Sequence, residues 1–96
     1  MIILQIKFSK IFIMSEKFYV YIIQTENETL YCGYTTDVER RFQEHKSGVG
    51  AKYTRANKPV KIVYTKEFST KSDALKEEYR IKHKLTRAQK LELINL

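Results

Sequence analysis

The sequence predicts an α+β fold in which a three-stranded, mainly antiparallel sheet is flanked by helices in the order β-β-α-β-α-α. Three observations predict it. Short segments rich in aromatic and β-branched residues alternate with segments of helical periodicity. A helix-capping motif precedes each helical segment. The first two strand segments are joined by a short polar turn, which is typical of an antiparallel hairpin.

The strands are predicted from composition and from the residues that bound them. Residues 18–24 (FYVYIIQ) form the first strand, residues 25–28 the turn, and residues 29–34 (TLYCGY) the second strand. Gly33, near the end of the second strand, indicates a bulge or a close approach of another group to the backbone. Residues 60–66 form the third strand.

Three helices are predicted over residues 36–46, 70–84 and 86–96. Each begins with a threonine that has an acidic or amide side chain three positions later. These pairs are Thr36 with Glu39, Thr70 with Asp73, and Thr86 with Gln89. Residues 47–59, between the first helix and the third strand, are rich in glycine and basic residues and are predicted to be a loop.

Size and charge indicate one soluble domain with an anionic partner. The chain has 96 residues, 43% hydrophobic and 30% charged, which suits a single modest core. Its net charge is +7, and all of the excess lies in residues 49–96, with twelve basic and five acidic side chains. Nucleic acid is the commonest partner of such a basic half. A solvated, lysine-rich surface is the alternative.

Several classes of protein are excluded or disfavoured. The lone cysteine, Cys32, permits no internal disulfide and no Cys/His zinc site, which suits the reducing cytoplasm. The apolar residues 1–14 are too few to cross a membrane, which takes about 20. We expect residues 1–16 to be an N-terminal extension, with Met14 as the true start, and residues 17–96 to be the domain. An added edge strand or a frayed tail is the alternative for the extension.

The first helix carries two large polar residues on its apolar stripe. Val38, Arg41, Phe42 and His45 follow the i, i+3, i+4, i+7 pattern. An inward-leaning arginine needs an acceptor for its five N–H donors. A phosphate and an internal carboxylate both remain open as that acceptor.

The second helix carries a glutamate within its apolar sector. Glu78 lies near Ala74 and Ile81 on the helical wheel, whereas we place Glu77 outside that sector. Carboxylates seldom face a core unless they are paired or bind a metal. An i,i+4 ion pair with Lys82, worth about 0.2–0.5 kcal/mol, is the alternative to a functional Glu78.

The hairpin offers two tyrosines that could share a face of the sheet. Tyr21 and Tyr31 project from the same face if the hairpin loop has an odd number of residues. Two phenols on one face can belong to the core or can line a site.

These residues together resemble the GIY-YIG nuclease superfamily, in its small stand-alone bacterial branch. Tyr19-Val20-Tyr21 and Tyr31-Cys32-Gly33 are similar to the two signature tripeptides, although Tyr19 replaces a glycine and Val20 and Cys32 replace isoleucines. Arg41 and Glu78 match the essential arginine and the metal-binding glutamate, and His45 matches a histidine found in several members. The resemblance covers residues 18 to about 94.

The resemblance implies metal-dependent hydrolysis of a nucleic-acid phosphodiester. Glu78 is expected to hold one Mg²⁺ or Mn²⁺, and Arg41 the phosphate. Tyr21 is expected to act as general base, with its pKa lowered by nearby cations, while Tyr31 and His45 orient the water and the phosphate. The expected contacts to phosphate and nucleic acid are Gly33, Lys52, Arg55, Lys58 and Lys61.

DNA is favoured over RNA as the partner, and no membrane partner is expected. Two other readings stay open on the same fold. One is a nucleic-acid-binding module without catalysis. The other is a structural or protein-interaction domain in which Glu78 serves only to pair with Lys82.

Overall fold

The structure is a computed structural model that describes residues 16–95. Strands β1 (Phe18–Thr25), β2 (Leu30–Thr35) and β3 (Pro59–Phe68) form one sheet in the order β2-β1-β3, and both neighbouring pairs are antiparallel. The predicted α+β class and antiparallel sheet are confirmed. The expected N-terminal extension lies outside the described residues except for its last position.

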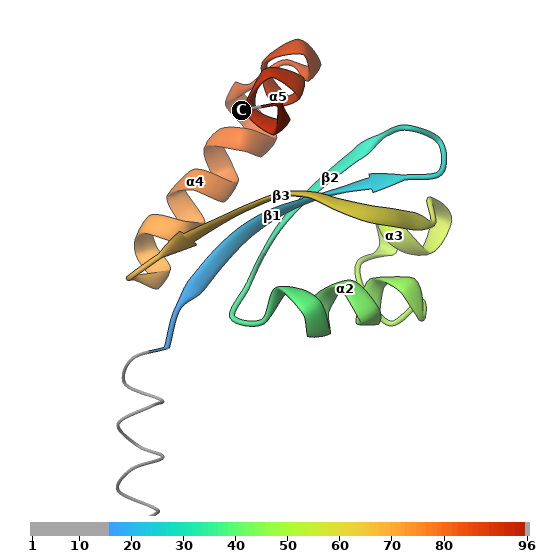
Figure 1. Cartoon of the computed structure of the whole chain (residues 1–96), viewed down its shortest axis with the longest axis horizontal. Helices are drawn as coiled ribbons and strands as arrows, with labels where there is room; N and C mark the ends of the chain where they lie inside the picture. The colour runs from blue at the N-terminus through green and yellow to red at the C-terminus, as the bar shows by residue number, and fades with distance from the viewer. Residues whose placement is uncertain (1–15, 96) are drawn as a thin grey trace, which may run out of the picture.

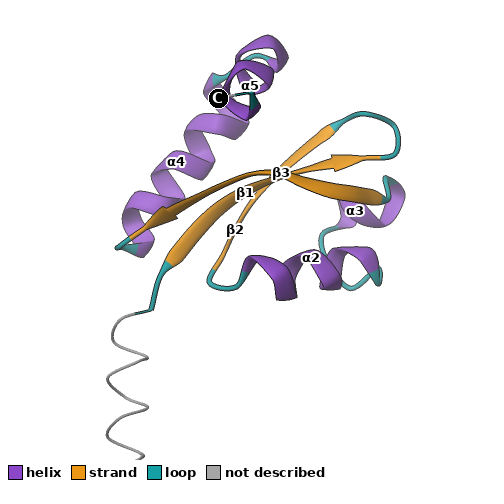
Figure 2. Ribbon diagram, in the orientation of Figure 1, coloured by secondary structure: helices purple, strands orange, loops and turns teal. Residues whose placement is uncertain are grey.

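Among the described residues, four helices cover the two faces of this sheet. They are α2 (Val38–Lys46), α3 (Lys52–Ala56), α4 (Lys71–Lys84) and α5 (Arg87–Ile94). Figure 1 shows α2 and α3 on one side of the strands and α4 with α5 on the other. Figure 2 shows the strands as a single layer between these two groups of helices.

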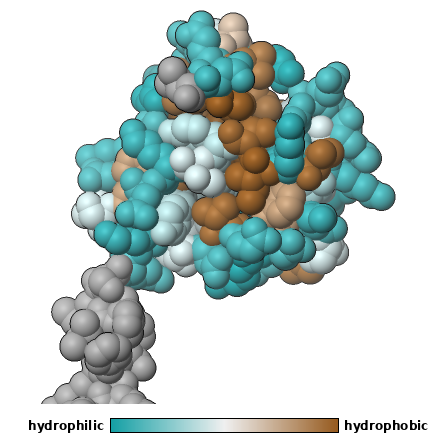
Figure 3. Space-filling model, in the orientation of Figure 1, coloured by the Kyte–Doolittle hydropathy of each residue, from teal (hydrophilic) through white to brown (hydrophobic). Residues whose placement is uncertain are grey.

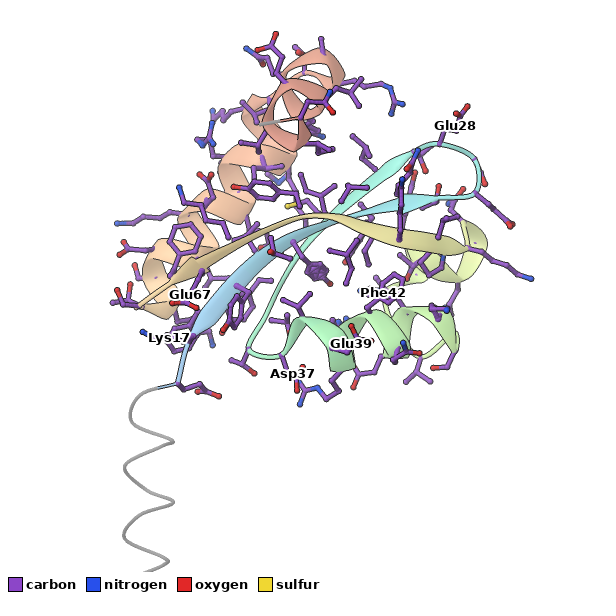
Figure 4. All side chains as sticks on the ribbon, viewed as in Figure 1. Lys17, Glu28, Asp37, Glu39, Phe42 and Glu67 are labelled. Carbon is purple, nitrogen blue, oxygen red and sulfur yellow. The ribbon has the colours of Figure 1, made fainter. Side chains whose placement is uncertain are left out.

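Alternation along β1 divides the core between the two faces. Val20 and Ile22 point toward α4 and pack with Cys32, Ala74 and Ile81, and all five residues are buried. The next residue along in each case, Tyr21 and Ile23, points toward α2 instead and packs with Phe42. Phe42 extends from α2 toward the sheet (Figure 4). Each helical layer therefore has its own small cluster of apolar side chains.

Two of the three predicted helix starts are confirmed. The hydroxyl of Thr70 caps α4, and Thr86 with Gln89 forms a complete capping box on α5. The first helix begins one residue later than predicted, because Asp37 and not Thr36 is its cap and accepts from the Arg40 N–H at 3.0 Å. The hydroxyl of Thr35 accepts from the Asp37 N–H at 3.1 Å, which fixes this later start.

Two further boundaries differ from the prediction. The predicted loop 47–59 contains the five-residue helix α3, which is too short to produce a visible helical period in the sequence. Strand β3 is longer than predicted at both ends, since it pairs with β1 from Pro59 to Phe68.

The surface is mainly hydrophilic, with one apolar strip. Figure 3 shows this strip running from the C-terminal helices down the face of the sheet, bordered by hydrophilic residues on both sides. Val60 and Leu91 are among the larger apolar side chains left exposed. Within residues 16–95, no helix is both long and apolar enough to cross a membrane.

Candidate active site

A buried tyrosine–histidine pair lies between the sheet and α2. The Tyr21 hydroxyl is 2.8 Å from His45 Nε2, and the two residues are 2% and 1% exposed. Two glycines make room for them. A Cβ on Gly33 would approach the Tyr21 hydroxyl closer than 3.0 Å, and a Cβ on Gly50 would approach His45 Nδ1 equally closely. Gly33, expected to contact phosphate, thus lies against the Tyr21 ring.

The hydrogen bonds around His45 determine its tautomer. Thr54 Oγ1 donates to the carbonyl oxygen of Ala51 at 3.0 Å and lies 2.6 Å from His45 Nδ1. With the one hydroxyl hydrogen assigned to this carbonyl, the hydroxyl accepts from an Nδ1–H. The Nε2 atom of the neutral ring therefore has a free lone pair, and Tyr21 donates its hydroxyl hydrogen to it.

Burial shifts the pKa of both residues of this pair, and for Tyr21 the shift is opposite to the one expected from the sequence. Burial raises the pKa of Tyr21 above its usual value, and Arg41 lowers it by less. The expected lowering of the Tyr21 pKa is therefore wrong, because the cost of desolvating a phenolate exceeds the effect of the nearby guanidinium. Burial also lowers the pKa of His45, as does Arg41, so the imidazole is neutral at pH 7.

Arg41 reaches the Tyr21 phenol from the same helix as His45. Its side chain is 31% exposed, and its Nη1 donates to Glu44 Oε1 at 2.9 Å. This bond raises the pKa of Arg41 more than any other interaction. A carboxylate of the protein therefore accepts one of the Arg41 hydrogen bonds, as one alternative held, although this glutamate lies at the surface. A further N–H donor faces the Tyr21 hydroxyl, and within residues 16–95 the remaining donors of the fork are available to an anion.

Tyr31 completes the group on this face. In the hairpin Tyr21 lies opposite Gly33 and Ile23 lies opposite Tyr31, so the loop has an odd number of residues and the two phenols project from one face. The Tyr31 ring centroid is 5.1 Å from that of His45 and 6.4 Å from that of Tyr21. Four of the five predicted catalytic side chains thus converge.

Glu78 approaches this group from the other side of the sheet. It lies on α4, and its carboxylate raises the pKa of Cys32, which faces α4. Its side chain is 21% exposed and lies 3.4 Å from Lys82 Nζ. That ammonium is 5.7 Å from the centroid of the Tyr31 ring. Lys82 therefore connects Glu78 to Tyr31 around the outer strand β2. Among residues 16–95, Glu78 makes no hydrogen bond to Tyr21, Arg41 or His45.

The placement of Glu77 outside the apolar sector is wrong. Its side chain is 13% exposed, less than that of Glu78, and it accepts two hydrogen bonds from Arg80 at 2.7 and 2.8 Å. Ala74 and Ile81 mark the centre of the buried line of α4. Glu77 and Glu78 flank that line on opposite sides, one toward β3 and one toward β2. Arg80 lowers the pKa of Glu77.

The acidic groups suit a hydrated ion better than an ion enclosed by protein ligands. The described residues contain no group of three or more His, Cys, Asp or Glu side chains close enough to hold a metal. Glu78 is partly exposed and its charged contact is one lysine at 3.4 Å, so its oxygens retain free lone pairs. Mg²⁺ is commonly bound by one or two carboxylates and keeps several waters. Glu78 fits that form of binding without a second carboxylate.

The four expected basic contacts are all exposed, but they do not form one surface. Lys52 and Arg55 lie on α3, on the α2 side of the sheet, and Lys58 follows them in the chain. Lys61 pairs with Gln24, and strand alternation directs both toward the α4 side. Lys61 is therefore separated from the α3 pair by the sheet.

The comparison with known families settles the family of this chain. The profile of the GIY-YIG catalytic domain matches residues 17–92. The chain belongs to the GIY-YIG family. Its similar relatives include the UPF0213 protein YsiG of Lactococcus lactis, 51% identical over 78 residues that cover 81% of this chain and 75% of the relative. A UPF0213 protein of Natronomonas pharaonis is 51% identical over 81 residues, covering 84% and 94%.

Solved structures of similar proteins agree with the GIY-YIG fold described above. A UPF0213 protein from Bacillus halodurans is 46% identical, with a TM-score of 0.54. A protein from E. faecalis is 41% identical, with a TM-score of 0.57. Each match covers 82% of this chain and 83% of the other. These similarities confirm the resemblance drawn from the sequence and the fold class.

Sequence reasoning missed Thr54 and Gly50 in this GIY-YIG site. Thr54 is 1% exposed and sets the His45 tautomer, and Gly50 leaves space for the imidazole. Both follow the first helix in a segment predicted to be a loop. Residues 50–55 are similar to the stand-alone branch of the superfamily, but that similarity assigned no role to either residue.

Proposed function

We propose that this GIY-YIG protein hydrolyses phosphodiester bonds of nucleic acid with one divalent metal ion. The observation that carries the proposal is the bonded series Tyr21–His45–Thr54 next to the partly exposed guanidinium of Arg41. A neutral histidine oriented to accept a proton through a phenol, beside a cation that can hold phosphate, is a catalytic arrangement. Burying these polar groups only for stability would give little net gain.

Phosphate binding is assigned to Arg41. One N–H donor is used by Glu44, and the remaining donors of the planar fork can make paired bonds to two phosphate oxygens. The guanidinium also stabilises the negative charge that develops on those oxygens during attack. Tyr31, which is half-buried beside His45 and Tyr21, helps to position the phosphate and the water.

The base is the Tyr21–His45 pair acting together. The attacking water gives its proton to the Tyr21 oxygen while Tyr21 gives its own to His45 Nε2. The water oxygen bonds to phosphorus, and the bond from phosphorus to the 3′ oxygen breaks. The 3′ oxygen leaves with the bonding electron pair and takes a proton from solvent water. Tyr21 need not become a free phenolate, which its raised pKa disfavours. The lowered pKa of His45 keeps its acceptor atom unprotonated near neutral pH.

Glu78 would hold the metal, as Mg²⁺ or Mn²⁺ with a shell of waters. Bound there, the ion supplies Lewis-acid stabilisation of the leaving oxygen and the phosphate charge. Lys82 must then give up its 3.4 Å contact with the carboxylate and turn toward the substrate.

The partner proposed is nucleic acid, with DNA favoured over RNA, because the net charge of +7 suits a polyanion. Lys52, Arg55 and Lys58 are exposed and are assigned to the phosphate backbone. Lys61 is assigned to a part of the strand that passes to the other side of the sheet. A single buried thiol suits a cytoplasmic location.

Cleavage assays with paired variants test the proposal. The purified protein should cut single-stranded, duplex or branched DNA in Mg²⁺ or Mn²⁺, and EDTA should stop the reaction. Glu78→Ala and Arg41→Ala should each reduce cleavage at least 100-fold, the order of loss for one group that stabilises the transition state. Far-UV circular dichroism should stay unchanged.

Two neighbouring residues provide matched controls. Glu77→Ala removes an adjacent carboxylate that pairs with Arg80, and Arg40→Ala removes an adjacent arginine whose side chain is 59% exposed. Both control variants should cleave like the unmodified protein. Cleavage that survives Glu78→Ala and Arg41→Ala would mean a contaminating nuclease or a different site.

One observation favours a second candidate, a structural or protein-interaction domain. Glu78 lies in an ion pair with Lys82, and this is the pairing that a structural role requires. In that case DNA does not bind and no metal supports turnover, whereas a nucleic-acid-binding module without catalysis would bind DNA with a strong dependence on salt. A double-mutant cycle on Glu78 and Lys82 separates the two, because a structural pair stabilises the fold and a metal ligand does not depend on Lys82.

A further inference from the structure

A small hollow lies beside the outer strand β2, next to the candidate active site. Its volume is about 180 Å³, and it is built from four elements that are distant in the chain. Its lining residues are Leu30, Tyr31, Cys32, Tyr53, Lys82 and Lys90. Tyr31 belongs to both places, since its ring also contacts His45. Whatever occupies the hollow therefore contacts a residue of the candidate active site.

Two tyrosines give the hollow a stacking surface. The rings of Tyr31 and Tyr53 are nearly parallel, with an interplanar angle of 20° and centroids 5.9 Å apart. Tyr31 is half-buried, whereas Tyr53 is 40% exposed, so the stack ends at solvent. Aromatic side chains that end at solvent in a basic groove are the usual platform for unpaired bases.

Two lysines make the hollow attractive to phosphate. Lys82 lies over the Tyr31 ring, with part of its charge balanced by Glu78. Lys90 lies on α5, is partly buried and, among residues 16–95, forms no ion pair with a carboxylate. The hollow therefore combines aromatic faces with a net positive charge, which matches a base carrying its phosphate.

We propose that the hollow lined by Tyr53, Tyr31 and Lys90 binds the base and phosphate of an unpaired nucleotide next to the phosphate held by Arg41. Bases inside a duplex are already stacked and paired, so the site selects single-stranded or frayed nucleic acid over continuous duplex. The position of this nucleotide relative to a scissile bond rests on the proposed function. The binding of an unpaired base in the hollow is independent of that function.

Binding is measured without metal, so that the outcome does not depend on catalysis. Fluorescence anisotropy of the full chain with a labelled oligo-deoxythymidine, in EDTA, should show tighter binding than to a blunt duplex of equal length. Tyr53→Leu should weaken single-strand binding about 5- to 150-fold, the range for one stacked base. Tyr53→Phe should retain most of the affinity, since the ring remains.

Controls come from the same chain. Tyr79→Leu alters another exposed tyrosine, 57% exposed and with its ring tilted against that of His83 on α4, and should leave affinity unchanged. Lys90→Gln should lower the salt dependence of single-strand binding by about 0.7 in log–log slope, the value for one phosphate contact. Lys76→Gln on the outer surface of α4 should lower it less.

The inference is overturned if Tyr53→Leu and Tyr79→Leu weaken binding equally, or if Tyr53→Leu weakens duplex and single-strand binding to the same extent. Equal affinity for both forms of DNA in the unmodified protein also overturns it. Tyr53-dependent binding of single strands with no cleavage in any metal supports the inference and refutes the proposed function. Metal-dependent cleavage that does not depend on strand pairing or on Tyr53 supports the proposed function and refutes the inference.

Discussion

Gly33 offers the sharpest test of how the site is packed. The Cβ of Gly33→Ala would lie closer than 3.0 Å to the hydroxyl oxygen, Cζ and Cε1 of Tyr21. Tyr21 is 2% exposed, so its ring cannot swing freely into solvent to make room. The ring must shift, and its 2.8 Å hydrogen bond to His45 is lost or lengthened.

The expected loss of stability follows from three contributions. Overpacking a close-packed site costs about 1–3 kcal/mol. Losing the hydrogen bond adds about 0.5–1.5 kcal/mol. Replacing a strand glycine by alanine returns about 0.5–1 kcal/mol. The net loss is therefore about 0.5–4 kcal/mol, and cleavage should fall with it because the relay from Tyr21 to His45 is displaced.

Urea denaturation followed by circular dichroism measures this loss, with two companion variants. Gly33→Ala in a Tyr21→Leu background should cost much less, because the ring that the methyl group meets is gone. Gly48→Ala meets no atom within 4 Å and is strained only by its φ of +84°, so it should leave cleavage unchanged. Equal destabilisation by Gly33→Ala with and without the Tyr21 ring would refute the packing argument, and leave phosphate contact as the reason for this glycine.

Three further outcomes are expected. Because the pKa of His45 is lowered from 6.5 in the folded state, the unfolded chain binds the proton first. Stability should therefore fall as pH drops below 6.5, by at most about 1.4 kcal/mol per pH unit, and a His45→Gln variant should lack that slope in urea titrations. Ile81→Ala, in the fully buried core, should lower the free energy of unfolding by about 2–5 kcal/mol. Leu75→Ala, at a 40% exposed site, should lower it by under about 1 kcal/mol. Similar urea midpoints for the two variants would contradict the assigned core. Burial raises the pKa of the Cys32 thiol from 9.0 to about 12. At pH 8 a disulfide reagent should therefore modify this thiol ~1,000-fold more slowly in the native protein than in the urea-unfolded chain. Equal rates would contradict the burial of Cys32.

Local signals in the sequence predicted the elements well. The caps at Thr70 and Thr86 follow from short-range chemistry that tertiary contacts did not override. The common face of Tyr21 and Tyr31 depended on an odd number of loop residues, which the strand register has and the predicted turn 25–28 did not. The shift of the first cap to Asp37 came from the Thr35 hydroxyl, which competes for the same turn. Such a competition depends on where the preceding strand ends.

The sequence could not predict on which side of the sheet each helix packs. Arg41 and Glu78 are both on inward-leaning helix positions, yet α2 and α4 cover opposite faces. Helical periodicity fixes a face relative to its own axis and carries no information about the layer beyond. The resemblance placed both residues in one site, and the structure links them only through Lys82 and Tyr31.

The environment of Tyr21 was also beyond the sequence. Its pKa direction depends on a balance between desolvation and the nearby Arg41, and that balance needs the burial of the phenol to be known. The roles of Thr54 and Gly50 arise only because α3 folds back against α2. These two roles therefore depend on tertiary packing, and no local sequence pattern predicts them.

The outer strand β3 bears on self-association. Within residues 16–95 no strand pairs with the outer side of this ten-residue strand, so that side is a template on which a second molecule could add its own strand, the first step toward aggregation. Here Pro59 at its start lacks an N–H to offer, and the exposed Lys61 and Lys66 bring like charges together whenever two such strands meet. Neutralising both lysines should therefore make the protein prone to precipitate even though its native contacts stay intact.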